Sequence, residues 1–294
     1  MTKQVIITTD SSADMPPQLR GEIGLRAMPL HIATNGRNGR DCVDIFPADL
    51  FEAHRLHKAI PKTAAPSPEE YREFFEGFTG QGADVVHVSL NGKVSSCWQN
   101  AVRGAQEAEG EVHVVDCRMF CFSQGMLCIQ AGRLRGEGLA AAEIAEELTR
   151  LRSKVWGWYD LDGLEFIAKS GRLPSVVAFG ASLFSIHPAV FADGSTGEFI
   201  IGKKYRGKSG PAAEAWMRDQ ARRFLEECDP AFCMIGHTSD VPAEISGPVF
   251  DIAREILQPH VGRLVFDGEG KGCAGCVTVS HVGGGSFAIA GMAK

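Results

Sequence analysis

The sequence has no surplus of positive charge. Its 294 residues include 30 Lys and Arg against 36 Asp and Glu, which gives a formal net charge of −6 at pH 7. Nucleic acids and anionic membrane surfaces attract proteins through concentrated Lys and Arg, so this balance argues against a nucleic-acid partner. Apolar residues make up 44% and charged residues 22% of the chain, close to the averages for globular proteins, which excludes a disordered or fibrous protein.

A secretory leader and a clear membrane span are also lacking. Residues 1–4 run straight into the short apolar stretch Val5–Ile7, without a long apolar core or a cleavage site, so we expect a cytoplasmic protein. The segment Leu173–Ala192 has no Asp, Glu, Lys or Arg over 20 residues, close to the length of a bilayer crossing. Its two prolines, three serines and His187 argue against an integral span. We expect core packing, or the wall of an apolar ligand cavity.

The nine cysteines show no disulfide spacing, so reduced thiols are expected. Cys273 and Cys276 form the one close pair of the zinc or redox type. A zinc site usually needs a second pair of ligands, and a thioredoxin-like motif opens a helix, whereas Val277–Ser280 has the composition of a strand. We therefore expect buried thiols, with no metal and no cofactor.

Alternating strand and helix patterns predict an α/β protein, and the length fits two domains, which we place at residues 1–157 and 158–294. In the first half, parallel strands covered by helices are expected. The second half has a hairpin pattern at 188–201 and a further α/β unit. Expected strands lie at 5–9, 25–33, 84–90, 111–116, 232–236 and 263–266, and expected helices at 47–58, 67–78, 123–135, 141–153, 211–227 and 243–257.

Three polar loops are candidates for chemistry: residues 62–67, 94–97 and 280–285. Hydroxyls and free backbone N–H groups at a helix N-terminus favour an anion, such as a carboxylate or phosphate. The plainer interpretation is that Ser67, Ser95 and Ser96 cap helices. His281 equally suits a structural role, although the three glycines after it allow close backbone approach to a ligand.

A Ser-His-Asp hydrolase is an alternative, with Ser95 or Ser96 as nucleophile, His281 as base and Asp10 as the acid. No Gly-x-Ser-x-Gly elbow surrounds either serine. The glycine loop matches neither the Walker nor the Rossmann spacing, so a nucleotide cradle has little support. Taken alone, the residues indicate an anion site in an α/β protein.

Five motifs in order along nearly the whole chain resemble those of the DegV family. The family has Thr-Asp-Ser-Ser-x-Asp, Pro-Lys-Thr-Ser-x-Pro-Ser-Pro, Leu-Ser-Gly-Thr-Tyr, Gly-Gly-Arg and His-x-Gly-x-Gly. The corresponding segments of this chain are Thr9–Asp14, Pro61–Pro68, Val94–Trp98, Ser170–Arg172 and His281–Gly285.

This resemblance implies a two-domain α/β fold with a long-chain fatty acid bound between the domains, and a non-catalytic, acyl-carrying role in a bacterial fatty-acid kinase system. It further implies that Thr63 and Ser95 hydrogen-bond the carboxylate, with help from Ser96 and Cys97 and with His281 close by. Gly171 and Arg172 would lie at the pocket mouth and engage the kinase subunit, and Gly283 and Gly284 would lie near the ligand. Transient membrane contact is compatible with such a role.

The chain departs from the family pattern at three places. Ser96-Cys97-Trp98 replaces Gly-Thr-Tyr, Ser170 replaces a glycine, and Asn91-Gly92 stands where the family has a serine. These changes leave the acyl length and the head-group geometry open. Cys97 would be reactive if a helix N-terminus lowered its pKa, but a thiol without a base partner is more often passive.

Overall fold

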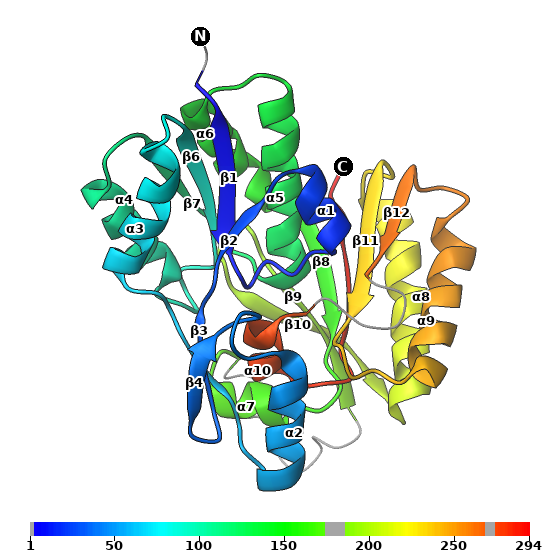
Figure 1. The fold of residues 1–294 in the computed structure, drawn as a ribbon. Coiled ribbons are helices and arrows are strands. Elements are labelled where there is room, and N and C mark those ends of the chain that lie inside the picture. The colour runs from blue at the N-terminus through cyan, green and yellow to red at the C-terminus, as the bar shows by residue number, and fades with distance from the viewer. Residues whose placement is uncertain (1–2, 174–185, 268–273) are drawn as a thin grey trace. The chain divides into compact units, whose positions relative to one another are not determined.

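The computed structural model describes residues 3–173, 186–267 and 274–294, which divide into two compact units (Figure 1). Unit 1 comprises residues 1–31, 63–153 and 193–198. Unit 2 comprises residues 32–62, 154–192 and 199–294. The chain thus changes unit at Ser153/Lys154, near the expected domain boundary, and also leaves and re-enters each unit elsewhere.

Unit 1 is built on a parallel four-stranded sheet in the order β2-β1-β6-β7. Its strands are β1 (Val5–Asp10), β2 (Arg26–Met28), β6 (Asp84–Ser89) and β7 (Val112–Asp116). The helices are α1 (Pro17–Glu22), α3 (Pro68–Thr79), α4 (Cys97–Glu107), α5 (Cys121–Gly136) and α6 (Ala141–Leu151), followed by the 3₁₀ turn η1 (Arg152–Lys154). The all-parallel sheet confirms the prediction for the first half of the chain.

Local sequence explains why these elements form. All six residues of β6 are buried, as expected for a central strand of a parallel sheet with helices on both faces. Ser67 caps α3: its Oγ accepts from the Glu70 N–H, while the Glu70 carboxylate accepts from the Ser67 N–H. The capping interpretation of Ser67 is therefore confirmed.

Unit 2 contains a mixed six-stranded sheet in the order β10-β9-β8-β13-β11-β12. Its strands are β8 (Val155–Asp160), β9 (Ile186–Ala192), β10 (Phe199–Arg206), β11 (Phe232–His237), β12 (Arg263–Phe266) and β13 (Phe287–Met292). The helices are α2 (Pro47–His57), α7 (Glu165–Ser170), α8 (Ser209–Glu227), α9 (Ala243–Leu257) and α10 (Cys276–Val282). The antiparallel pairing of β9 with β10 confirms the predicted hairpin.

The core of unit 2 lies under α8 and α9, which pack side by side (Figure 1). Trp216 and Phe224 of α8 are completely buried. The rings of Trp156 and Phe224 meet edge to face at 5.7 Å, a favoured aromatic geometry. These large side chains hold one long helix against the sheet.

A small third sheet has the order β4-β3-β5, with β3 at His31–Thr34, β4 at Arg37–Arg40 and β5 at Lys62–Ala64. Asn35 and Gly36 join β3 to β4 with φ values of 44° and 76°. Positive φ at both positions is typical of a tight hairpin turn and explains the Asn-Gly pair.

Two strand predictions need correction. The single strand expected at residues 25–33 is two strands, β2 and β3, because Pro29 lacks the N–H that a continuous ladder needs. The strand expected at Val277–Ser280 is part of helix α10. Helix α10 packs against α2 and α7, and this tertiary packing overrides the strand preference of Val and Thr. The argument that a strand follows Cys276 is therefore wrong.

The apolar segment 173–192 lies partly outside the described residues, and its described end forms the buried strand β9. Among the helices that the structure describes, none has both the length and the apolar content of a membrane span.

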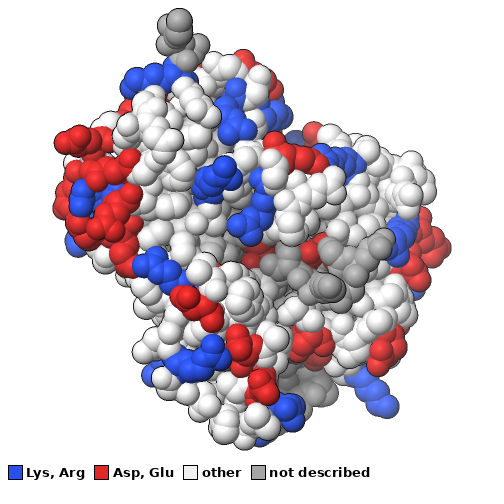
Figure 2. Space-filling model, viewed as in Figure 1, with Lys and Arg blue, Asp and Glu red and all other residues white. Residues whose placement is uncertain are grey.

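Charged side chains are mixed over the face drawn in Figure 2, with acidic groups gathered over α3 and α4. On α3, Arg72 lies between two of these acids, because its guanidinium pairs with Glu69 and, at 2.6 Å, with Glu76. Basic side chains therefore lie among the acidic ones on this face.

Candidate functional site

Thr63 and the serine loop belong to unit 1. Thr63 lies in β5 and is half-buried. The amide of Asn100, in the first turn of α4, donates to the Pro66 carbonyl at 2.7 Å. This bond joins the loop that follows Thr63 to the helix that follows Ser95, so the structure brings these two polar loops together.

Ser95 organises the start of α4. Its Oγ accepts from the Cys97 N–H at 3.2 Å and donates to the Cys97 Sγ at 3.0 Å. Ser96 occupies the N-cap position and is exposed, but its side chain makes no cap bond. The capping role expected for these serines is thus carried by Ser95. A sulfur is a weak acceptor, so the hydroxyl proton of Ser95 is available for a stronger one.

Cys97 is completely buried, and burial, together with the charge of Asp10, raises the pKa of its thiol. The alternative that the helix N-terminus makes this thiol reactive is wrong, because desolvation of the thiolate outweighs the bond from Ser95. Trp98 packs over Gly92, where an added Cβ would lie 2.9 Å from the indole ring. Two departures from the family pattern therefore fit each other: the Trp98 ring occupies the space that a side chain at position 92 would need.

Asp10, at the end of β1, is the polar centre of unit 1. One carboxylate oxygen accepts from the Tyr71 hydroxyl and lies 3.3 Å from His87 Nε2. The other accepts from Ser89 Oγ at 2.8 Å and from the Leu90 N–H at 2.6 Å. Burial alone would raise the pKa of Asp10, but the imidazole, the amide and the phenol favour the carboxylate, so the pKa is lowered.

This arrangement gives no support to Asp10 as the acid of a hydrolase triad. A carboxylate has about four lone-pair directions, and three of those of Asp10 take hydrogen bonds from within unit 1, while His87 Nε2 lies 3.3 Å away. Sequence analysis missed His87 and Tyr71 as its partners. The available signal was a histidine inside the apolar strand 84–90, because a buried imidazole needs a polar partner.

Asn91 is a second residue that sequence analysis left without a role. It is buried, and its Nδ2 donates to the Gly197 carbonyl at 2.8 Å and to the Arg118 carbonyl at 3.2 Å. Its Oδ1 accepts from the Lys93 N–H. One side chain thus anchors the distant segment 193–198 next to the β6–α4 loop.

The remaining candidate residues belong to unit 2. His281 lies near the end of α10, and burial, together with the positive charge of Arg172, lowers its pKa to about 4. The imidazole is therefore neutral at pH 7. A general base works best with a pKa near the working pH, so His281 is a poor base for activating a serine.

Arg172 is exposed, and its guanidinium donates to the Ser170 carbonyl at 2.7 Å. Gly171 ends α7 with φ 70°, a left-handed conformation that glycine adopts without strain. Gly171 thus ends helix α7, and the guanidinium of Arg172 directly after it is exposed to solvent.

The glycine loop after His281 runs against acidic side chains of unit 2. A Cβ on Gly284 would lie 1.7 Å from Asp240 Oδ2, and one on Gly285 would lie 2.5 Å from Asp162 Oδ2. Gly283 has φ 73°, and a Cβ there would touch Phe166 at 3.0 Å. These glycines are therefore required by close packing within the protein, whatever ligand is bound.

A cavity of about 590 Å³ lies in unit 1 near the amino ends of β1 and β6. Its lining includes Lys3, Asp84, Glu111 and Arg135. None of the candidate carboxylate-binding residues lines it, and its charged walls do not suit an acyl chain.

Comparison with known proteins gives one consistent result. A sequence model described as "Uncharacterised protein, DegV family" matches residues 4–294. A DegV domain-containing protein of Deinococcus radiodurans is 26% identical over 286 residues, 97% of each chain. A structure described as fatty-acid binding of a DegV family protein from Thermus thermophilus superposes with a TM-score of 0.82 at 26% identity, covering 99% of this chain and 100% of that one. A stearic acid-binding protein of Eubacterium ventriosum has a TM-score of 0.81 at 20% identity, covering 99% and 97%, and supports the fold.

Proposed function

This chain belongs to the DegV family, and on that basis we propose that it binds one long-chain fatty acid, with Thr63 and Ser95 hydrogen-bonding the carboxylate. The observation that carries the proposal is the likeness to the fatty-acid-binding Thermus thermophilus protein across 99% of the chain. Polar groups suited to a carboxylate are present on the matching motifs.

The start of α4 supports this assignment. Ser95 Oγ accepts the Cys97 N–H and gives its own proton to a sulfur. A carboxylate would take that proton in a stronger, charge-assisted bond, while the bond from the Cys97 N–H is kept. The backbone N–H groups of the first turn point toward the helix N-terminus and, with the helix dipole, add attraction for the negative charge.

We also propose a role for His281 in carboxylate binding, as the resemblance to the DegV family implies. A neutral imidazole carries one N–H donor and can hydrogen-bond a carboxylate without prior protonation. The negative charge would favour the imidazolium form, so ligand binding should raise the pKa of His281 above its value of about 4 in the free protein.

The binding proposal is tested by native mass spectrometry with organic extraction of the purified protein, followed by titration of the delipidated protein with oleate or palmitate. We expect one fatty acid per chain. Thr63→Ala and Ser95→Ala should each cost about 1.5–3 kcal/mol, a loss of affinity of roughly ten- to hundred-fold.

The matched control is Ser67→Ala, because Ser67 lies in the same loop as Thr63 but caps α3. It should lower stability by about 1 kcal/mol and leave affinity unchanged. Native affinity in a Thr63→Ala, Ser95→Ala double variant would overturn the residue assignment. An empty protein that takes up no added fatty acid would overturn the function.

We further propose that this cytoplasmic protein presents the bound carboxylate to a fatty-acid kinase subunit, with transient membrane contact during lipid exchange. The exposed guanidinium of Arg172 is the contact that we assign to the kinase. In an assay of ATP-dependent acyl-phosphate formation with a purified kinase subunit, Arg172→Ala should lower the rate while fatty-acid affinity stays native. Lys169→Ala is the control, since Lys169 is also exposed on α7 but pairs with Glu165.

A further inference from the structure

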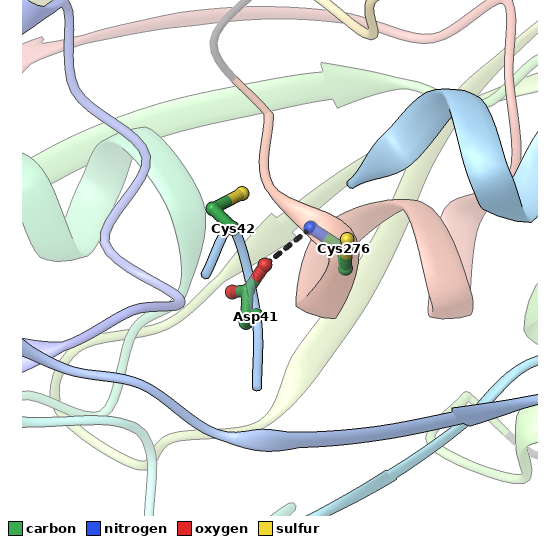
Figure 3. A group of neighbouring side chains, drawn as sticks. All are labelled: Asp41, Cys42 and Cys276. Atoms are coloured by element: carbon green, nitrogen blue, oxygen red, sulfur yellow. Dashed lines mark hydrogen bonds between the residues drawn. The ribbon is translucent and has the colours of Figure 1, made fainter. Parts of the chain in front are cut away.

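Asp41, Cys42 and Cys276 form a polar cluster in unit 2 that the fatty-acid proposal does not use. Asp41 and Cys42 follow β4, and Cys276 is the first residue of α10 (Figure 3). One carboxylate oxygen and the two sulfurs all lie within 4.8 Å of one another. Two segments more than 230 positions apart thus place three potential metal ligands together.

Asp41 is held in position with one oxygen unsatisfied. Its Oδ1 accepts from the Cys276 N–H at 2.8 Å (Figure 3). The side chain is buried, with 2% of the residue exposed, and Oδ2 has no hydrogen-bond partner among the described residues. Burial of an unpaired carboxylate oxygen is costly, and a cation removes that cost. The bond to Oδ1 fixes the carboxylate as outer bonds fix metal ligands elsewhere.

The Cys276 thiol lies in surroundings that oppose its ionisation. The hydrogen bond with Cys42, followed by burial and the charge of Asp41, raises the pKa of the Cys276 thiol. Its Sγ now donates to the Ile45 carbonyl at 3.1 Å. A divalent cation reverses this situation, because it stabilises the Cys276 thiolate that burial and the Asp41 carboxylate oppose.

We propose that Asp41, Cys42 and Cys276 bind one Zn²⁺ ion. Two thiolates and a carboxylate are donors that zinc accepts, and the soft sulfurs disfavour Mg²⁺ and Ca²⁺. With Zn–S bonds of about 2.3 Å, tetrahedral sulfurs lie about 3.8 Å apart, so the cluster needs only a small contraction. Cys42 is exposed and gives the ion a path from solvent, and three protein ligands leave the fourth position to water.

Binding converts two thiols to thiolates and releases their two protons to solvent, so zinc affinity should rise with pH. The sequence expectation of no metal at Cys276 rested on the lack of a second pair of ligands, and Asp41 and Cys42 lie beside Cys276 in that place.

The test uses the full chain, reduced, stripped with a chelator and kept free of oxygen. Titration with Co²⁺ should give thiolate-to-cobalt charge-transfer absorption that saturates at one equivalent, and Zn²⁺ should displace the cobalt. Cys42→Ser changes an exposed side chain and should fold normally. It should weaken Zn²⁺ binding at least about ten-fold, since loss of even an outer-shell partner costs roughly 10–100-fold.

Asp41→Asn keeps an acceptor for the Cys276 N–H and should lower Zn²⁺ affinity while retaining the charge-transfer band. The double variant Cys228→Ser, Cys233→Ser removes two other buried thiols of unit 2 and should bind as the native chain does. Native affinity in Cys42→Ser would overturn the site, and so would a native chain that shows no charge-transfer band. A Cys42–Cys276 disulfide that forms without metal uptake would also replace the proposal.

Discussion

Each unit ends a central strand with a completely buried aspartate, and the two carboxyl groups titrate in opposite directions. Asp10 ends β1 in unit 1 and Asp160 ends β8 in unit 2, both with 0% exposure. The pKa of Asp10 is lowered, whereas burial, together with the charge of Asp162, raises the pKa of Asp160 well above its usual value.

The difference lies in the partners. Asp10 receives hydrogen bonds on both oxygens, while neither oxygen of Asp160 has one among the described residues. His187 is the nearest imidazole to Asp160, with Nδ1 at 3.8 Å from Oδ1, too long for a hydrogen bond. Equal burial therefore has opposite consequences: in unit 1 the surroundings favour the charged form of the aspartate, whereas in unit 2 they favour its neutral form.

Asp10→Asn should have the largest effect on stability. It leaves the donors of Tyr71, Ser89 and Leu90 facing an uncharged amide, and because hydrogen bonds to a buried charged group are the strong ones, we expect a loss of about 3–5 kcal/mol. Urea unfolding at pH 7 measures the change. In the native chain, the contribution of Asp10 is present above the unfolded carboxyl pKa of about 3.9 and is lost as the pH falls through the lower folded value. A change below about 1 kcal/mol would show that Asp10 is not the centre of unit 1.

Tyrosine-to-phenylalanine substitutions compare the two units directly. Tyr71→Phe removes a donor to the buried Asp10 and should cost about 1.5–3 kcal/mol. Tyr205→Phe removes a bond of 2.9 Å to Asp219, whose side chain is 34% exposed and paired with Lys203. Solvent can replace that bond, so we expect a loss below about 1 kcal/mol. Equal losses in urea titrations would contradict the contrast.

Asp160→Asn should act in the opposite direction to Asp10→Asn. Because the folded pKa of Asp160 is raised, its contribution is complete below about pH 3.9 and is lost as the pH rises toward the folded value. The variant should match the native chain near pH 4 and become progressively more stable than the native chain as the pH rises toward 8. Thermal unfolding across this range measures the slope, and a variant that is less stable at pH 8 would refute a raised pKa of Asp160.

The smallest effect concerns His281. Its ring should titrate near pH 4 in the ligand-free protein, as followed by NMR, and Arg172→Ala should raise that midpoint because a nearby positive charge is removed. Arg254→Ala is the control, since Arg254 pairs with Asp251. An unchanged midpoint in Arg172→Ala would show that burial alone keeps the imidazole neutral.

The sequence predicted the fold class and most element positions because the signals were local. The cap at Ser67 acts over four residues, and its prediction is confirmed. Helix α10 was missed because its β-branched residues favour a strand, and the packing against α2 and α7 that decides otherwise is not visible in local sequence.

The candidate site was predictable in part. The family motifs predicted which loops carry polar groups, and Ser95 and Ser96 lie at the start of α4 as expected. Thr63 instead lies in β5, and His281 lies in helix α10 where it was expected after a strand. The partners of Asp10 could not be predicted, because Tyr71 and His87 reach it across 61 and 77 positions of chain. The link from Asn91 to Gly197 spans 106 positions for the same reason.

That last link has a consequence for synthesis. Unit 1 is completed by residues 193–198, which are made after a stretch of unit 2, so the ribosome must add about 40 residues beyond Ser153 before Asn91 can meet Gly197. At about 5–20 residues per second, the nascent unit 1 waits several seconds with this carbonyl partner missing. A chain shortened to residues 1–153 would never form the bond from Asn91 to Gly197. The boundary between the two units therefore does not lie at one position of the sequence.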